Sequence, residues 1–167
     1  MMYKGCFSGM KIRSTKAVTL LEMVMGLIVL MPVLLMVMDL TVITLAVQIN
    51  DNAAREAVRL AASGDPNQAQ ARALQVIARI NKGTAGYVSN IILSQLTFNP
   101  ANLQASATAL VPYGGVITGS VTVQTQATVT PFVVQYVYPG PYLFNSAQTC
   151  PVTYTVPNTA GGQTIAP

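Results

Sequence analysis

The feature that most constrains this chain is an apolar run of sixteen residues, from Met23 to Met38, that contains no polar side chain. It lies inside a longer apolar stretch, Lys16 to Val47, in which Glu22 and Asp39 are the acidic residues. About 20 apolar residues in a helix are enough to cross a bilayer. The run therefore predicts a single-pass transmembrane and assembly helix, assigned to residues 18–47.

Charge is distributed unevenly along the chain. Only 8% of the residues are charged, whereas soluble domains have about 25%, which favours a membrane or assembly protein. Four basic residues and no acid precede Val18, so the net charge of +4 belongs to a basic cytoplasmic leader, residues 1–17. Because basic residues beside a span favour the cytoplasmic side, the N-terminus is predicted inside and the C-terminus outside. The rest of the chain has no basic surplus, which argues against a nucleic-acid partner.

A cleaved secretory signal peptide is the alternative interpretation of this start. Such a signal has an apolar core of about 7–15 residues and then small residues at its cleavage site. Here the core is longer, has Glu22 near its beginning and ends at Thr44 to Gln48 without such a site. We therefore favour the transmembrane span. Cys6 and Cys150 lie on opposite sides of it and are not expected to pair.

The first helix is expected to continue past the membrane to Ala62. Pro32 removes a helical hydrogen bond, which predicts a kink or local unwinding. Asp39 ends the charge-free run and is expected at the outer membrane interface. Residues 48–82 are assigned to an amphipathic helical region outside the membrane. Small residues that recur every four positions form its predicted helix packing face: Ala53, Ala57 and Ala61.

A second helix is predicted to begin after a helix stop at Ser63-Gly64. Asp65 fits the N-cap, Pro66 the first helical position and Gln68 the reciprocal capping position. The helix is expected to end at Lys82, with Gly83 as its C-cap. Its predicted buried face consists of Ala69, Ala73, Leu74, Ile77 and Ile80.

The apolar period changes to two in residues 83–156, which predicts a strand-rich domain. Ser120 to Thr130 has the clearest alternation. The other predicted strands are Asn90 to Phe98, Gln104 to Val111, Phe132 to Tyr138 and Val152 to Val156. Residues 157–167 are rich in Gly, Thr and Pro and are predicted to be a flexible tail. The expected fold class is α+β, with a long N-terminal helix, a second amphipathic helix and a small C-terminal antiparallel sheet.

The side chains offer little catalytic chemistry. The chain has no histidine, and no charged residue follows Lys82. General acid–base catalysis needs a positioned proton carrier, and a nucleophilic Cys150 would need a base beside it. The sequence also has no phosphate-binding loop and no cluster of metal ligands. We therefore expect no enzyme activity, no cofactor, no metal and no small-molecule substrate.

The start of the apolar stretch resembles a type IV prepilin processing site. A basic leader and a small residue precede Val18-Thr19-Leu20-Leu21-Glu22-Met23 and a long apolar helix. The resemblance implies that a prepilin peptidase cleaves between Ala17 and Val18, which makes Glu22 the fifth residue of the mature chain. The chain departs from the family pattern at Ala17, where glycine is usual, and at Met23, where Flp pilins have an aromatic residue.

Glu22 also has a physical rationale in an assembly. A carboxylate in apolar surroundings is costly unless it is paired. Cleavage would create a free α-amine at Val18, and in a staggered helix bundle Glu22 of one subunit can pair with the Val18 amine of a neighbour. The hypothesis is that this pair sets the register of assembly.

Ala17 to Ala62 resembles the TadE-like minor pilins, or pseudopilins, of tight-adherence (Flp) pilus systems. Those proteins have a glutamate motif, a proline in mid-span, an acidic residue and an Ala-Ala-Arg-Glu-Ala segment, which match Glu22, Pro32, Asp39 and Ala53 to Ala57. The resemblance implies a pilin-like fold and a minor subunit held in the bacterial inner membrane. Its partners would be the prepilin peptidase, other pilin subunits and the pilus assembly platform, and its role would be adhesion and biofilm formation.

Two alternatives remain open at this point. One is a pseudopilin of a type II secretion system. The other is an uncleaved single-pass membrane protein with an extracytoplasmic β domain that binds a partner.

Overall fold

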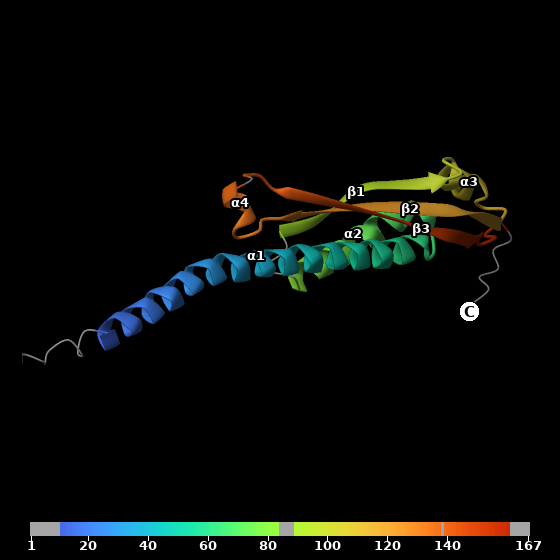
Figure 1. Ribbon diagram of the computed structural model, residues 1–167. Coiled ribbons are helices and arrows are strands. Elements are labelled where there is room, and N and C mark those ends of the chain that lie inside the picture. The colour runs from blue at the N-terminus through green and yellow to red at the C-terminus, as the bar shows by residue number, and fades with distance from the viewer. Residues whose placement is uncertain (1–10, 84–88, 138, 161–167) are drawn as a thin grey trace, which may run out of the picture.

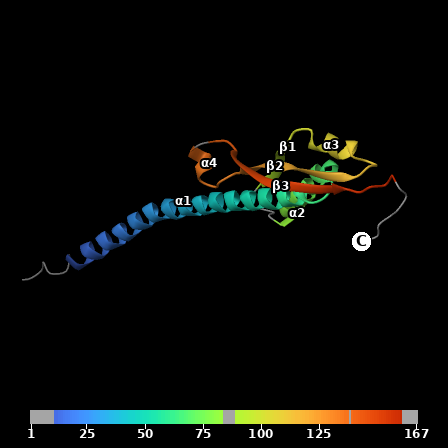
Figure 2. The ribbon, with the colours of Figure 1, turned by 90° about the vertical axis from the view of Figure 1, so that its right-hand side faces the viewer.

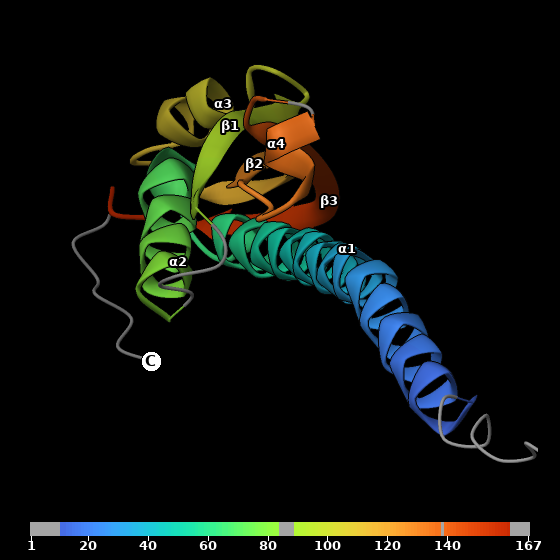
Figure 3. The ribbon, with the colours of Figure 1, turned by 60° about the vertical axis from the view of Figure 1, so that its left-hand side comes forward.

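The protein is described from a computed structural model, which covers residues 11–83, 89–137 and 139–160. Its longest element is α1 (Lys11–Ala62), one helix of 52 residues. Figure 1 shows the C-terminal half of α1 beneath a small β-sheet, while the N-terminal half projects away from the folded body. The helix passes through Pro32 without a break, and Figures 1 and 3 show its N-terminal part curving away from the sheet. The kink at Pro32 stays a prediction.

The turn after α1 has the helix stop and the N-cap that were predicted from the sequence. Gly64 has a φ of 83°, a conformation that glycine adopts without a steric penalty. The Asp65 side chain then accepts the backbone N–H of Asn67 at 2.9 Å. This cap begins the short helix η1 (Pro66–Gln68), which leads into α2 (Ala69–Gly83).

Arg72 joins α2 to the end of α1. Its guanidinium donates to the backbone carbonyls of Leu60 at 2.9 Å, Ala61 at 3.3 Å and Asp65 at 2.7 Å. The last carbonyls of a helix have no partner within the helix. A side chain of the second helix therefore caps the first.

The buried face of α2 differs from the predicted one at one position. Leu74 is 46% exposed, so its assignment to the core was wrong. Ile80 is half-buried and packs against the core. Positions i, i+4, i+7 and i+8 form the stripe that faces the body, and Leu74 lies beside this stripe. The buried residues are Ala69, Ala73, Val76 and Ile77.

The sheet has three antiparallel strands in the order β1 (Ser89–Asn99), β2 (Gly115–Val129) and β3 (Tyr142–Val156). This confirms the expected α+β class with an antiparallel sheet. Figures 2 and 3 show α1 and α2 packed against one face of this sheet. The alternation predicted for β2 is confirmed, because every second residue is buried toward the helices: Val121, Val123, Thr125, Ala127 and Val129.

The other face of the sheet is uncharged and carries mostly polar side chains, with Ile92, Val116 and Leu143 as exposed apolar residues. Thr122 and Thr149 share a hydrogen bond of 2.8 Å across β2 and β3, and Gln126 donates to Asn145 at 2.9 Å. Cross-strand pairs of this kind stabilise an antiparallel sheet from its outer face.

The strand predicted at Gln104 to Val111 is wrong, because this segment contains α3 (Leu103–Ala109). Alanine at every second position imitates the period of a strand, yet alanine has the highest helix propensity. In the helix, Leu103 and Ala107 lie one turn apart and are both buried.

The strand predicted at Phe132 to Tyr138 is also wrong over its described residues. The chain forms a turn and then α4 (Val134–Val137), and Tyr138 lies outside the described residues. The predicted strand Val152 to Val156 exists but is only the end of β3, which begins at Tyr142. Pro151 lies within β3, which is an edge strand and can therefore accommodate a proline.

Candidate membrane and assembly surface

The N-terminal half of α1 is an exposed apolar rod. Every residue from 17 to 38 is exposed, including Met23 at 76%. This helix is long and apolar enough to cross a membrane, with a mean hydropathy of 2.6 over its most apolar 18 residues, none of which is buried. Burial of an apolar surface of this extent is favourable, either in lipid or against other helices.

The residues predicted for processing and assembly lie on this rod. Ala17, Val18 and Glu22 are exposed, and α1 is helical through all three. Pro32 is exposed as well. The structure therefore leaves this part of the chain accessible to lipid or protein partners and does not fold it into the body.

Asp39, predicted at the outer membrane interface, also contacts the folded body, which the sequence did not predict. It has no exposed surface. Its Oδ1 accepts the N–H of Phe132 at 2.8 Å, and its Oδ2 accepts the N–H groups of Val133 at 2.6 Å and Val134 at 2.9 Å. These charge-assisted bonds satisfy a carboxylate that would otherwise be costly to bury.

This arrangement holds the connection between β2 and β3 against α1. The three donors precede or begin α4, where backbone N–H groups lack helical partners. One sequence feature could have indicated that Asp39 binds another group, because a carboxylate within an apolar helix needs a partner. It carried no indication that the partner lies more than 90 positions away.

Two further polar contacts fasten α1 to β3. The Asn50 side chain donates to the Phe144 carbonyl at 2.9 Å, and the Ser146 hydroxyl donates to Asp51 at 2.6 Å. Asn50 and Ser146 are buried. Together with Asp39, these residues attach the β2–β3 hairpin to the helix at points about three turns apart. Asn50 and Ser146 were not among the residues identified from the sequence.

The alanine stripe lies between α1 and the rest of the folded body. Ala53, Ala57 and Ala61 are each at most 1% exposed. Ala57 and Ala61 join the main core with residues of α2 and the sheet, and Ala53 joins a second cluster with Ile77 of α2. Small side chains permit this close approach, so the stripe is used within the subunit.

The described residues offer no metal centre. Within residues 11–83, 89–137 and 139–160, no three histidine, cysteine, aspartate or glutamate side chains come together as potential ligands. Cys150 is a free, half-buried thiol, and Cys6 lies outside the described residues.

Comparison with known proteins gives no match: no protein-family model fits the chain, and no curated protein or solved structure is significantly similar to it. The likeness to TadE-like minor pilins therefore rests on the sequence motifs alone.

Proposed function

We propose that the protein is a minor pilin or pseudopilin of a tight-adherence (Flp) pilus, processed by a prepilin peptidase and incorporated through its N-terminal helix. The observation that carries the proposal is the division of α1 into two halves. One half is an exposed apolar rod, and the other is the helix on which the folded body is built.

Such a division suits a subunit that is stored in a membrane and then assembled. In the bilayer, lipid covers the rod, and in a pilus the same surface packs against rods of neighbouring subunits. Because α1 is continuous, the position of the rod in the bundle determines the position of the body outside it. The contacts of Asp39, Asn50 and Asp51 with the hairpin hold helix and body together.

Glu22 is the one acidic residue on the exposed rod before Asp39. In a bundle, this carboxylate would be buried among apolar helices and would need a cation. The α-amine that cleavage creates at Val18 supplies one, four residues away along the helix axis. Subunits staggered by about one helical turn, about 5.4 Å, would bring the two groups together.

One observation favours a second candidate, an uncleaved single-pass anchor for a binding domain. The helix α1 begins at Lys11 and runs through the Ala17–Val18 bond without interruption. Cleavage therefore requires that this part of the helix unwind in the peptidase. A permanent anchor has no such requirement. Placement in the inner membrane with the N-terminus inside is common to both candidates.

The two candidates are separated by the mass of the protein from cells with and without a prepilin peptidase. We expect the peptidase to remove residues 1–17, so that the mature chain begins at Val18. Ala17→Ile should block the cut, and Ala17→Gly should preserve it. If the chain keeps Met1 while an established prepilin is cleaved in the same cells, the uncleaved anchor is the correct assignment.

A further inference from the structure

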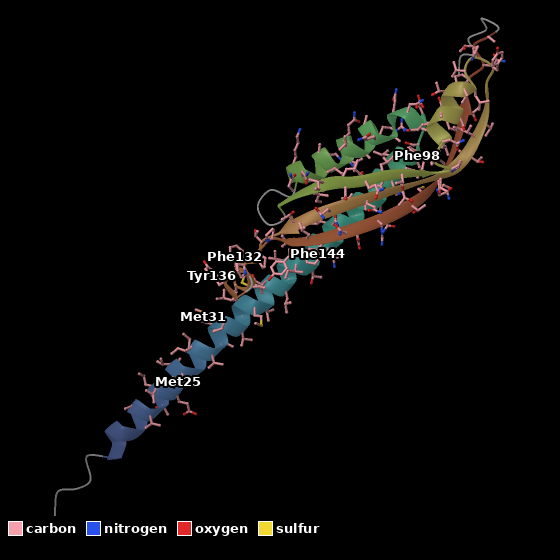
Figure 4. The ribbon with its side chains drawn as sticks, turned by 90° about the horizontal axis from the view of Figure 1, so that it is seen from above. Met25, Met31, Phe98, Phe132, Tyr136 and Phe144 are labelled. Atoms are coloured by element: carbon pink, nitrogen blue, oxygen red, sulfur yellow. The ribbon has the colours of Figure 1, made fainter. Side chains whose placement is uncertain are left out.

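The connection between β2 and β3 exposes two aromatic side chains close to the apolar rod. Phe132 is 63% exposed and Tyr136 is 84% exposed. Figure 4 shows both of them beyond Phe144, at the end of the body that faces Met31 and the rod. The whole connection, Thr130 to Pro141, contains no charged residue.

The height of this connection along α1 is set by Asp39, which binds the backbone of Phe132, Val133 and Val134. From Ala17 to Asp39 the helix rises about 33 Å at about 1.5 Å per residue. The hydrocarbon core of a bilayer is about 30 Å thick. When the apolar rod spans the bilayer, Asp39 and the segment it binds therefore lie at the outer boundary of the hydrocarbon.

We propose that the segment from Thr130 to Val137 is a membrane-contact loop, with Phe132 and Tyr136 inserted between the lipid headgroups and the acyl chains of the outer leaflet. Aromatic residues are enriched at this depth, where a ring can be apolar on one side and hydrated on the other. The absence of charge removes the desolvation penalty that a lysine or glutamate would bring. The proposal rests on the transmembrane placement of α1 in the proposed function, but not on its processing or assembly.

The lipid surface fits this loop because the loop continues the apolar surface of the rod. Val37, Met38 and Leu40 flank Asp39 and are all exposed large hydrophobic residues. A bilayer that covers the rod up to this level would also meet the loop. Contact with lipid would give the body a second attachment point and restrict its rotation about the axis of α1. We expect no dependence on anionic lipid or on salt, because the loop carries no charge.

The chain lacks tryptophan, so a single introduced tryptophan reports on one position. Tyr136→Trp places the probe in the loop. Tyr113→Trp is the matched control, because Tyr113 is 77% exposed but precedes β2 at the opposite end of the sheet. Leu30→Trp reports on the span. Each full-length variant is reconstituted in phosphatidylcholine vesicles that contain lipids brominated either near the headgroup or deep in the acyl chain.

We expect the Tyr136→Trp protein to emit at shorter wavelength than the Tyr113→Trp protein, to be quenched by shallow bromines, and to be quenched less by aqueous iodide than the Tyr113→Trp protein. Emission and iodide quenching equal to those of Tyr113→Trp would overturn the proposal. Protection from iodide without quenching by brominated lipid would also overturn it, because a second protein copy would then cover the loop.

The Leu30→Trp protein separates failure of the loop from failure of the span. Quenching by deep bromines places α1 in the bilayer, so a negative result with Tyr136→Trp then counts against the loop alone. If Leu30→Trp is not quenched, the transmembrane placement is wrong, and with it both the proposed function and the membrane-contact loop. Failure of peptidase cleavage leaves the loop proposal unaffected.

Discussion

The Oδ2 atom of Asp39 accepts the backbone N–H of Val133 at 2.6 Å, and the two residues are 94 positions apart in the chain. This bond joins the middle of the long helix to the connection between two strands. It makes Asp39 both the end of the apolar run and the point at which the folded body begins.

The first prediction concerns this contact. Asp39→Asn keeps the size of the side chain but replaces one acceptor oxygen with a donor, which opposes the backbone N–H groups. We expect faster hydrogen exchange at the amides of Phe132, Val133 and Val134, and faster proteolysis within the membrane-contact loop. Thr41→Val is the matched control, because the Thr41 hydroxyl donates to the Val37 carbonyl of its own helix. Exchange rates equal to those of the control would show that Asp39 does not hold the loop.

The second prediction concerns the contact between α3 and β2. A Cβ atom on Gly119 would overlap the Leu103 side chain and lie 2.7 Å from the Asn99 carbonyl oxygen. Gly119→Ala should therefore lower the free energy of unfolding by about 1–3 kcal/mol, the usual cost of overpacking. Gly83→Ala is the control, because nothing lies within 4 Å of its Cβ position. Denaturant unfolding in detergent measures both variants, and equal stability would contradict the close packing at Gly119.

The third prediction compares two arginines of α2. Arg72 donates to the Leu60 and Ala61 carbonyls at the end of α1 and to the Asp65 carbonyl in the following turn, whereas Arg79 forms a solvent-exposed ion pair with Glu56. Arg72→Gln should lower the free energy of unfolding by about 1.5–3 kcal/mol, because bonds from a charged donor are lost. Arg79→Gln should lower it by about 1 kcal/mol or less, as for other exposed pairs.

The same unfolding assay can examine the shape of the Arg72 side chain. Arg72→Lys retains the charge but not the planar fork that reaches several carbonyls at once. We expect it to behave like Arg72→Gln. Full recovery of stability by lysine would mean that charge alone, rather than the hydrogen bonds, is what matters at this helix end.

The fourth prediction concerns Glu22. Glu22→Ala should leave membrane insertion intact and reduce the fraction of the protein recovered in sheared pili by about tenfold or more, because the Val18 amine loses its partner in the bundle. Glu22→Gln should show the same loss, since it removes the charge but keeps the size. Both variants should still be cleaved, which keeps processing separate from assembly. Unchanged incorporation of either variant into pili would sink the pairing hypothesis.

Local patterns in the sequence were sufficient for the two long helices and for the central strand. The charge-free run and its amphipathic continuation predicted α1 to Ala62, where the helix ends. The capping residues Asp65 and Pro66 predicted the start of the second helical segment. The alternation of Val, Thr and Gln predicted β2 and its buried face. Each of these signals comes from neighbours within a few positions, which is why a single sequence reveals them.

Errors arose where local pattern and tertiary contact disagree. The alanines of α3 alternate like a strand, but burial of Leu103 and Ala107 on one side of a helix decides the conformation. The segment that begins at Phe132 is apolar enough for a strand. Its first three backbone N–H groups donate to the Asp39 carboxylate, so they are not available to a β ladder. Leucine is usually a core residue, but Leu74 lies beside the buried face of α2 and is exposed.

The sequence by itself determined that this chain has an apolar rod, an α+β body and no charged side chain after Lys82, because composition and periodicity are properties of short windows. Only the tertiary structure decided what Asp39 does and where Phe132 and Tyr136 lie relative to the rod. A hydrogen bond forms between groups that are close in space, and the folding of the β2–β3 hairpin along α1 is what brings these groups together. The apolar rod can therefore be predicted from the sequence. The position along α1 at which the folded body is attached depends on a contact between residues more than 90 positions apart.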